Sequence, residues 1–215
     1  MRPPRIRRAP RGHPADPGRS RRLPGRRGRG LTPIPVYSAH LSGTPLGTIR
    51  LWATDRGIRR LDFRSGPDLA LPDERISTGP PPSHLATALQ SLREYIDGRR
   101  RTFHVPLDLG PVTPFRQRVY DYLQEIPYGY VATYGDIARH VADGPESARA
   151  VGQAVGSNPV AILIPCHRVV SSEGRLHGFG GGLERKSFLL RLEGVEVEGS
   201  TPSSKVHPEV LRLPF

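Results

Sequence analysis

The segment ILIPCHRVV, residues 162–170, places the only cysteine of the chain directly before a histidine. A thiol becomes a strong nucleophile when it loses its proton, and a neighbouring imidazole can accept that proton and stabilise the thiolate. Pro165 ends the apolar run before Cys166, so we predict a buried strand up to Ile164 and then a turn that presents both side chains. The alternative is a buried structural cysteine, the commoner role for a lone cysteine.

A carboxylate that could orient His167 lies in the segment LERKSFLLRLEG, residues 183–194. Its apolar residues recur at helical spacing, which predicts a helix that Gly194 closes. Glu193 follows Leu189 by four positions and therefore lies on or beside the apolar face, where a charge requires a partner. A Cys–His–Glu arrangement would supply that partner and would favour a protease, an acyltransferase or an alkyl-transfer protein.

The segments before the cysteine predict a helical unit. TPFRQRVYDYLQEI opens with Thr113 as helix cap and Pro114 at the first helical position. Two short helices follow over 133–142 and 147–159, and the short glycine turn between them is typical of a helix-turn-helix. Small residues dominate the second of these helices, which can therefore approach another surface closely; the plainer alternative is tight packing on a neighbouring helix.

The segment 36–109 predicts an α/β scaffold without obvious chemistry. Alternating apolar residues around the turn TDRG predict a hairpin over 47–63, followed by a loop over 64–82. A helix is expected over 83–98, with Ser83 as its cap and Gly98 as its stop. A further strand over 102–109 is also compatible with the pattern.

The basic charge of the chain is concentrated at its beginning. Residues 1–30 hold eleven Arg and one Asp, a net charge of +10 out of +12, which leaves +2 for the other 185 residues. A run of Arg, Pro and Gly predicts disorder, with either non-specific attraction to nucleic acid or no role at all. A single cysteine excludes an internal disulfide and a cysteine-rich zinc site, and no apolar run is long enough for a membrane span. A cytoplasmic protein is expected.

The segment SNPVAILIPCHRVV, residues 157–170, resembles the defining segment of the O6-alkylguanine-DNA alkyltransferases. The resemblance extends over residues 113–195 through ATYGDIA, SARAVGQAVG and GFGGGLERKSFLLRLEG. It implies DNA repair by irreversible, stoichiometric transfer of a methyl or other alkyl group from O6-alkylguanine to Cys166, with O4-alkylthymine as a second candidate substrate. It also implies a single-turnover enzyme without cofactor or metal, which binds double-stranded DNA through the minor groove as a monomer.

The same resemblance assigns roles around the thiol. Cys166 would be the alkyl acceptor and His167 its base, linked through a water to Glu193. Asn158 would brace the cysteine turn. Tyr134 would form a hydrogen bond to guanine N3 and supply a proton as the base leaves.

The remaining roles concern DNA and the extruded base. Arg149 would fill the gap left by the flipped nucleotide, and the small residues beside it would let the helix approach the minor groove. Those small residues are Ala148, Ala150 and Gly152. The backbone carbonyls of Cys166 and Val169 would accept the exocyclic amine, and the N–H of Gly180 would donate to O6.

Three positions depart from the usual pattern of the family. Phe179 stands where many members have Tyr, and it keeps an apolar wall without the hydroxyl. Gly180 replaces a Ser found in some members and would widen the pocket. Ser157 replaces an Arg, so one phosphate contact would be lost.

Two other classes of protein stay open. A non-enzymatic damage-binding protein of the alkyltransferase-like kind would share the scaffold, although such proteins lack the cysteine. A cysteine hydrolase would use the same pair but would need an oxyanion hole and would turn over repeatedly.

The predicted fold class is α+β, with four parts along the chain. A disordered basic tail (1–35) precedes a small α/β domain (36–109). A mainly helical domain (110–195) carries the helix-turn-helix and the acceptor cysteine, and an extension (196–215) follows.

Overall fold

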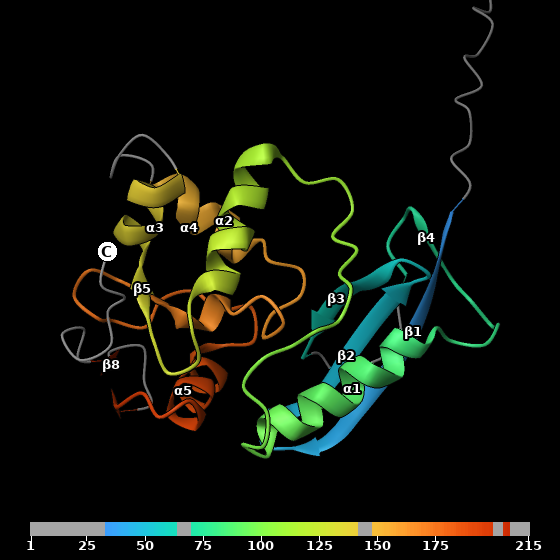
Figure 1. Ribbon diagram of the computed structural model, residues 1–215, viewed down its shortest axis with the longest axis horizontal. Helices are drawn as coiled ribbons and strands as arrows, with labels where there is room; N and C mark the ends of the chain where they lie inside the picture. The colour runs from blue at the N-terminus through green and yellow to red at the C-terminus, as the bar shows by residue number, and fades with distance from the viewer. Residues whose placement is uncertain (1–32, 64–69, 142–147, 200–203, 207–215) are drawn as a thin grey trace, which may run out of the picture. The chain divides into compact units, whose positions relative to one another are not determined.

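The computed structural model describes residues 33–63, 70–141, 148–199 and 204–206. Nearly all of the predicted tail 1–35 and most of the extension 196–215 lie outside these residues, and so does the predicted turn between the two short helices. Within the described part, the α+β prediction is confirmed: a mixed sheet with one helix precedes a helical region (Figure 1). The division into four parts stays a prediction.

The sheet of the N-terminal region has four strands in the order β3-β2-β1-β4. β1 (Ile34–Thr44), β2 (Gly47–Thr54) and β3 (Gly57–Asp62) are antiparallel neighbours, which confirms the predicted hairpin. β4 (Glu74–Ile76) pairs in parallel with β1 and lies inside the segment predicted as a loop, so that part of the loop prediction is wrong.

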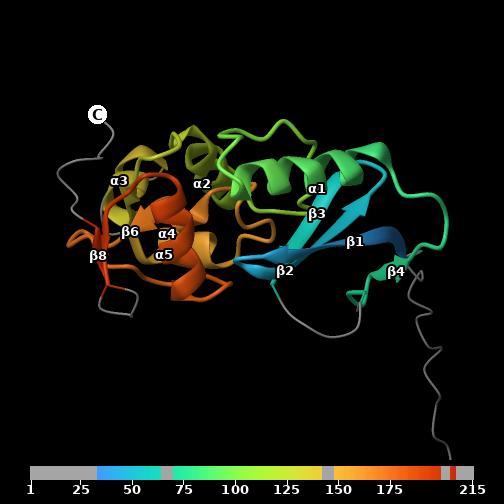
Figure 2. The same cartoon turned by 90° about the horizontal axis from the view of Figure 1, so that it is seen from below.

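Helix α1 (Ser83–Ile96) covers one face of this sheet in both views (Figure 1 and Figure 2). Leu85, Leu92 and Ile96 are buried on its inner side, as its helical apolar spacing predicts, and Tyr95 is buried beside them. Pro82, rather than Ser83, is the N-cap, and no side chain caps the first turn. Gly98 follows the helix with φ +74°, a backbone conformation that glycine adopts without steric cost.

The outer edge of β3 holds two segments that are distant in sequence. The N–H of Ile58 donates to the Pro106 carbonyl at 2.8 Å, and the N–H of Leu61 donates to the Pro159 carbonyl at 2.8 Å. The segment 102–109 therefore makes an isolated bridge to β3, and the strand predicted there does not form. Because Pro159 leads into the cysteine turn, β3 anchors that turn.

The helical region contains α2 (Pro114–Glu125), α3 (Tyr134–Val141), α4 (Ala148–Gly156) and α5 (Leu183–Leu192). Thr113 caps α2 as predicted, since its hydroxyl accepts from the Arg116 N–H at 3.3 Å. The helices α2, α3 and α4 pack against one another. The helix-turn-helix itself stays a prediction, because its turn lies outside the described residues.

Short strands tie the cysteine segment to the helices. β5 (Ala132–Thr133) pairs in parallel with β6 (Val169–Val170). β5 leads directly into Tyr134 at the start of α3, and β6 follows the single turn η2 (Cys166–Arg168). The pairing therefore brings Tyr134 and the cysteine turn to the same place. Further along, β7 (Val197–Glu198) and β8 (Lys205–Val206) form an antiparallel pair.

Candidate active site

The segment before the cysteine is a tight turn and not the buried strand that the sequence predicts. Ala161 and Ile164 form a bridge to each other across this turn. Ile162 has φ +73° and is the only described residue other than glycine with a positive φ. A β-branched residue is strained in this region of backbone space and is held there only by its surroundings. Strain of this kind is found mostly at functional sites.

Asn158 braces the turn from inside, as the family resemblance predicts. Its side-chain Nδ2 donates to the Ile164 carbonyl at 2.8 Å, and its Oδ1 accepts from the Val160 N–H at 3.0 Å. Both ends of the amide are therefore used on the backbone of the turn. The thiol of Cys166 is buried, with 5% of the residue exposed.

The predicted histidine and carboxylate meet directly. His167 Nε2 lies 3.0 Å from Glu193 Oε1, and both side chains are fully buried. The prediction that a water links His167 to Glu193 is therefore wrong. Since a carboxylate only accepts, Nε2 donates its proton to Glu193, and Nδ1 keeps a lone pair. Nδ1 is buried and has no hydrogen-bond partner in the part of the chain that the structure describes.

Two residues that the sequence did not indicate complete the surroundings of Glu193. The Arg168 guanidinium donates to it from Nε at 2.9 Å and from Nη2 at 2.8 Å. The Tyr95 hydroxyl, from α1, donates to Oε1 at 2.6 Å. We call Glu193, His167, Arg168 and Tyr95 the Glu193 cluster. Their contacts span 25 to 98 positions of sequence, so no local pattern could pair them.

The charges of this cluster follow from its contacts. Burial alone would raise the pKa of Glu193, but His167 and Arg168 outweigh it and lower the pKa to about 2. Burial lowers the pKa of His167, although Glu193 opposes the shift, so the imidazole is neutral at pH 7. Burial raises the pKa of Cys166, although Asn158 and Lys186 act against it. The resting site therefore holds a protonated thiol beside a neutral base.

Lys186 is a further residue that the sequence analysis missed. It lies on α5 and is fully buried, and its ammonium donates to the carbonyls of Val169 and His177 at 2.5 and 2.6 Å. Burial lowers its pKa to about 8, while the nearby Cys166 thiol acts in the opposite direction. The sequence did contain an indication of its burial, because Lys186 lies three residues before Leu189 and four before Leu190, on the same side of the helix.

Cys166 lies at the wall of a cavity of about 470 Å³, which we call the alkyl pocket. Asn158, Phe179 and Gly180 also line it, so the structure brings these predicted site residues together. The N–H of Gly180 has no hydrogen-bond partner in the described chain, and a Cβ built on Gly180 would meet open space. The Gly180 N–H can therefore donate a hydrogen bond to a ligand in the alkyl pocket, and the space beside Gly180 is open.

The N-terminal region also contributes to the alkyl pocket. Phe63 and Leu71 line it, and the Phe63 ring lies 5.8 Å from the Phe179 ring, centroid to centroid. A Cβ on Gly181 would come within 2.8 Å of both rings, so glycine is required for this close approach. The interpretation of residues 36–109 as a scaffold alone is therefore wrong.

Tyr134 and α4 lie beside this pocket. Burial, and then Cys166, raises the pKa of Tyr134, so its phenol keeps a proton to donate. An ideal Cβ on Gly152 would be 3.9 Å from the Tyr134 ring. Arg149 and Ala150 are exposed, whereas Ala148 and Gly152 are half-buried. Ala154, another small residue of this helix, is buried in the core.

The exposed side of α4 consists of Arg149, Ala150, Gln153 and Gly156. These positions recur at helical spacing, and the helix contains no acidic residue. Arg149 makes no hydrogen bond or ion pair with the described residues. We call these four residues the α4 face; among the described residues, its one cation, Arg149, has no partner.

Two absences concern the described residues only. They contain no group of three or more His, Cys, Asp or Glu placed to hold a metal ion. Among the same residues, no helix combines the length and apolar character needed to cross a membrane.

Comparison with known proteins finds the same family over both halves. Residues 38–109 match "6-O-methylguanine DNA methyltransferase, ribonuclease-like domain", and residues 114–195 match the DNA binding domain of the same family. The chain is similar to a methylated-DNA--protein-cysteine methyltransferase of Methanosarcina acetivorans, with 38% identity over 70% of this chain and 94% of the relative. A Mycobacterium tuberculosis relative is 47% identical over 53% of this chain and 68% of its own.

Solved structures agree in fold with this result. The crystal structure of Mycobacterium tuberculosis O6-methylguanine methyltransferase superposes with a TM-score of 0.62 at 37% identity. The match covers 74% of this chain and 92% of that one. A structure of the same mycobacterial protein in complex with DNA matches with the same TM-score at 36% identity.

Proposed function

The chain belongs to the O6-methylguanine DNA methyltransferase family, and we propose that Cys166 is the residue on which its reaction ends. It repairs DNA by transferring a methyl group from O6-methylguanine to its own cysteine, the reaction of a methylated-DNA--protein-cysteine methyltransferase. The sequence contains one cysteine, so the acceptor is Cys166. The observation that carries this assignment is a thiol at the alkyl pocket, next to a neutral imidazole that Glu193 orients.

Activation of the thiol begins at His167. His167 acts as the base for Cys166, because Nδ1 keeps its lone pair although it makes no direct hydrogen bond to the thiol in this structure, and the Glu193 carboxylate stabilises the imidazolium that results. Arg168 and Tyr95 hold that carboxylate in place, so its charge does not have to reorganise during the reaction. Lys186 stabilises the thiolate once it has formed.

Transfer is a displacement at the alkyl carbon. The Cys166 sulfur forms a bond to that carbon while the bond to guanine O6 breaks, and the electron pair of the broken bond stays with the guanine. Tyr134 donates its phenolic proton to N3, so the guanine leaves as a neutral base. Asn158 keeps the cysteine turn rigid while this happens.

The base is held by backbone groups of the same segment. The carbonyls of Cys166 and Val169 accept the exocyclic amine, and the Gly180 N–H donates to O6. Each carbonyl already accepts one bond, Val169 from Lys186 and Cys166 from the Val169 N–H, and each keeps a second lone pair. The open space at Gly180 and the apolar Phe179 wall favour alkyl groups larger than methyl, and O4-alkylthymine as a second substrate.

Double-stranded DNA binds to the α4 face through the minor groove. Ala150 on this face and the half-buried Ala148 and Gly152 beside it allow a close approach, and Arg149 enters the stack where the damaged nucleotide has been flipped out. We propose that the protein acts in this way as a monomer in the cytoplasm.

The reaction consumes the protein, because a thioether at Cys166 does not return to a thiol. We propose that it uses no cofactor, since the alkylated base and the thiol supply all the atoms of the displacement. The test is to incubate the protein with an excess of duplex DNA containing O6-methylguanine and to count the lesions repaired per chain. We expect one. A damage-binding protein would repair none, and a hydrolase would continue to turn over; either result would overturn the proposal. Cys166→Ala serves as the control and should repair none.

A further inference from the structure

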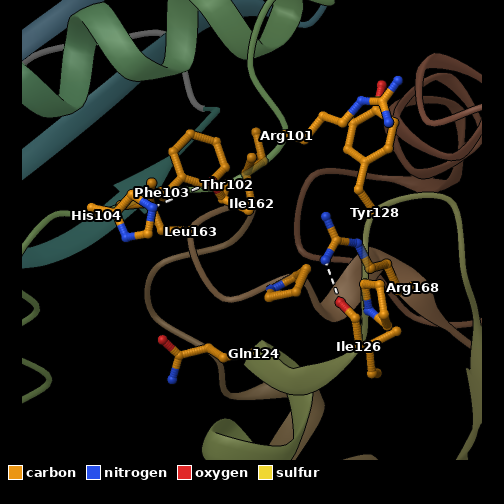
Figure 3. A pocket seen from close by; sticks show the side chains of 12 residues that line it. Arg101, Thr102, Phe103, His104, Gln124, Ile126, Tyr128, Ile162, Leu163 and Arg168 are labelled. Carbon is orange, nitrogen blue, oxygen red and sulfur yellow. Dashed lines mark hydrogen bonds between the residues drawn. The ribbon is translucent and has the colours of Figure 1, made fainter.

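The cysteine turn separates two cavities that share no lining residue. Cys166 faces the alkyl pocket, whereas Ile162, Leu163 and Arg168 line a second cavity of about 260 Å³, which we call the rear cavity (Figure 3). Three segments close it: residues 101–104, the turn after α2, and the cysteine turn. We propose that the rear cavity binds a small aromatic anion and that this ligand slows alkyl transfer at Cys166.

The charge of the rear cavity favours an anion. Arg101, His104 and Arg168 line it, and none of its lining residues is an Asp or Glu. The Arg101 side chain makes no hydrogen bond or ion pair with the described residues. Arg168 has five N–H groups and uses three, two toward Glu193 and one toward the Ile126 carbonyl at 2.5 Å (Figure 3). Two donors of a buried guanidinium therefore remain for a ligand.

The walls of the cavity favour a flat ligand. The Arg101 guanidinium lies 5.3 Å from the centroid of the Tyr128 ring, and Phe103 and Leu163 add apolar surface. A planar ring can stack on such a surface while its anionic group reaches the guanidinium groups. At about 260 Å³ the cavity is slightly below the usual range for small-molecule sites, which limits the ligand to about the size of a mononucleotide.

A ligand in the rear cavity affects the Cys166 thiol because the cysteine turn forms the wall between the two cavities. An anion on the two remaining donors of Arg168 shares the positive charge of the guanidinium with Glu193, and so weakens its hold on the carboxylate that supports His167. Its negative charge also disfavours the thiolate on the other side of the turn. The strained Ile162 lies in the same wall, so the conformation of the turn depends on what fills the space behind it.

The test uses uridine 5′-monophosphate as the probe, because it joins one planar ring to an anionic phosphate. Binding in the alkyl pocket would survive Arg101→Ala, since Arg101 lines the rear cavity and not the alkyl pocket. We expect a dissociation constant of about 0.1 mM by calorimetry, and much weaker binding of uridine or of inorganic phosphate alone. Arg101→Ala should weaken binding about tenfold. Arg99→Ala is the matched control, since Arg99 is exposed, pairs with Asp97 and does not line the cavity.

A second arm measures the effect on the cysteine. Saturating uridine monophosphate should slow transfer from free O6-benzylguanine severalfold in the unmodified protein and in Arg149→Ala, a substitution on the α4 face. Binding that is absent, that survives Arg101→Ala, or that disappears in Arg149→Ala would overturn the proposal, and so would an unchanged rate. The binding arm is independent of the proposed function, whereas the rate arm rests on it.

Discussion

The Glu193 cluster and the α4 face differ in whether their charged side chains are buried and paired within the described part of the protein. In the cluster, a buried carboxylate accepts from an imidazole, a guanidinium and a phenol, and 4% of the Glu193 residue is exposed. On the α4 face, Arg149 is exposed and makes no bond to the described residues. The charges of the cluster are paired before any substrate arrives, whereas the cation of the α4 face has no partner among the described residues.

This difference in pairing matches the two proposed roles: the Glu193 cluster supports the reaction at Cys166, and the α4 face recognises DNA. Removing one partner from a buried, hydrogen-bonded ion pair leaves an uncompensated charge and costs about 3–5 kcal/mol of stability. An exposed arginine without partners supports little of the fold, so its loss affects only what it binds. Substitutions in the two regions should therefore differ in kind as well as in size.

The largest effect is expected in the Glu193 cluster. Glu193→Gln keeps the shape but removes the charge that supports the imidazolium, so transfer from O6-benzylguanine should slow by about 10²- to 10³-fold. Single-turnover rates measured on folded protein would show this. Glu184→Gln, an exposed glutamate on the same helix, is the control and should change little. Equal rates for the two variants would mean that Glu193 is only structural.

The same variant gives a test against pH. The pKa of Glu193 is about 2 in the folded protein and about 4.5 when exposed, so the folded state favours the ionised form. The stability that this contributes is fully present above pH 4.5 and is lost as the pH falls toward 2. We expect the difference in unfolding free energy between the unmodified protein and Glu193→Gln to be about 3 kcal/mol at pH 7 and to shrink over this interval. A difference that does not vary with pH would contradict the assignment.

A smaller and more selective effect is expected on the α4 face. Flipping a base costs a few kcal/mol, and an inserted side chain offsets part of it. Arg149→Ala should therefore slow repair of duplex DNA by about tenfold to thirtyfold but change transfer from free O6-benzylguanine less than twofold. Gln153→Ala, on the same face, is the matched control. Equal losses with both substrates would place Arg149 in the fold rather than in recognition.

The sequence predicted the residues proposed to react at the site better than the residues that hold them in place. Asn158, Cys166, His167 and Glu193 could be predicted because they lie in segments that resemble a known family. Their partners could not, because Tyr95 is 98 positions from Glu193 and looks like any apolar-face residue of α1. The buried Lys186 was detectable only as a charge on an apolar helix face.

The errors in the fold have the same origin. β4 has three residues in a Pro- and Gly-rich segment and forms only by pairing with β1, some forty positions earlier. The run 161–164 has the composition of a strand, yet Asn158 and β3 fold it into a turn. Local patterns therefore identified the hairpin and the helices but not the elements that long-range contacts create.

The smallest effect on chemistry is expected from the basic tail. Residues 1–30 carry a net charge of +10, and each phosphate that a protein neutralises contributes about −0.9 to the slope of log affinity against log salt. If half of the eleven arginines contact DNA, deleting 1–30 should flatten that slope by about 4–5 units and leave transfer at saturating DNA unchanged. Duplex affinities at several salt concentrations would decide this, and identical slopes would make the tail an inert extension.

The most direct test of the account is the position of the transferred methyl group. The protein is incubated with duplex DNA containing O6-methylguanine, and its intact mass and proteolytic peptides are then measured. We expect one added methyl per chain, on the peptide that holds residue 166, and none on Cys166→Ser, which should still bind the DNA. A methyl group on any other residue, or more than one per chain, would contradict it.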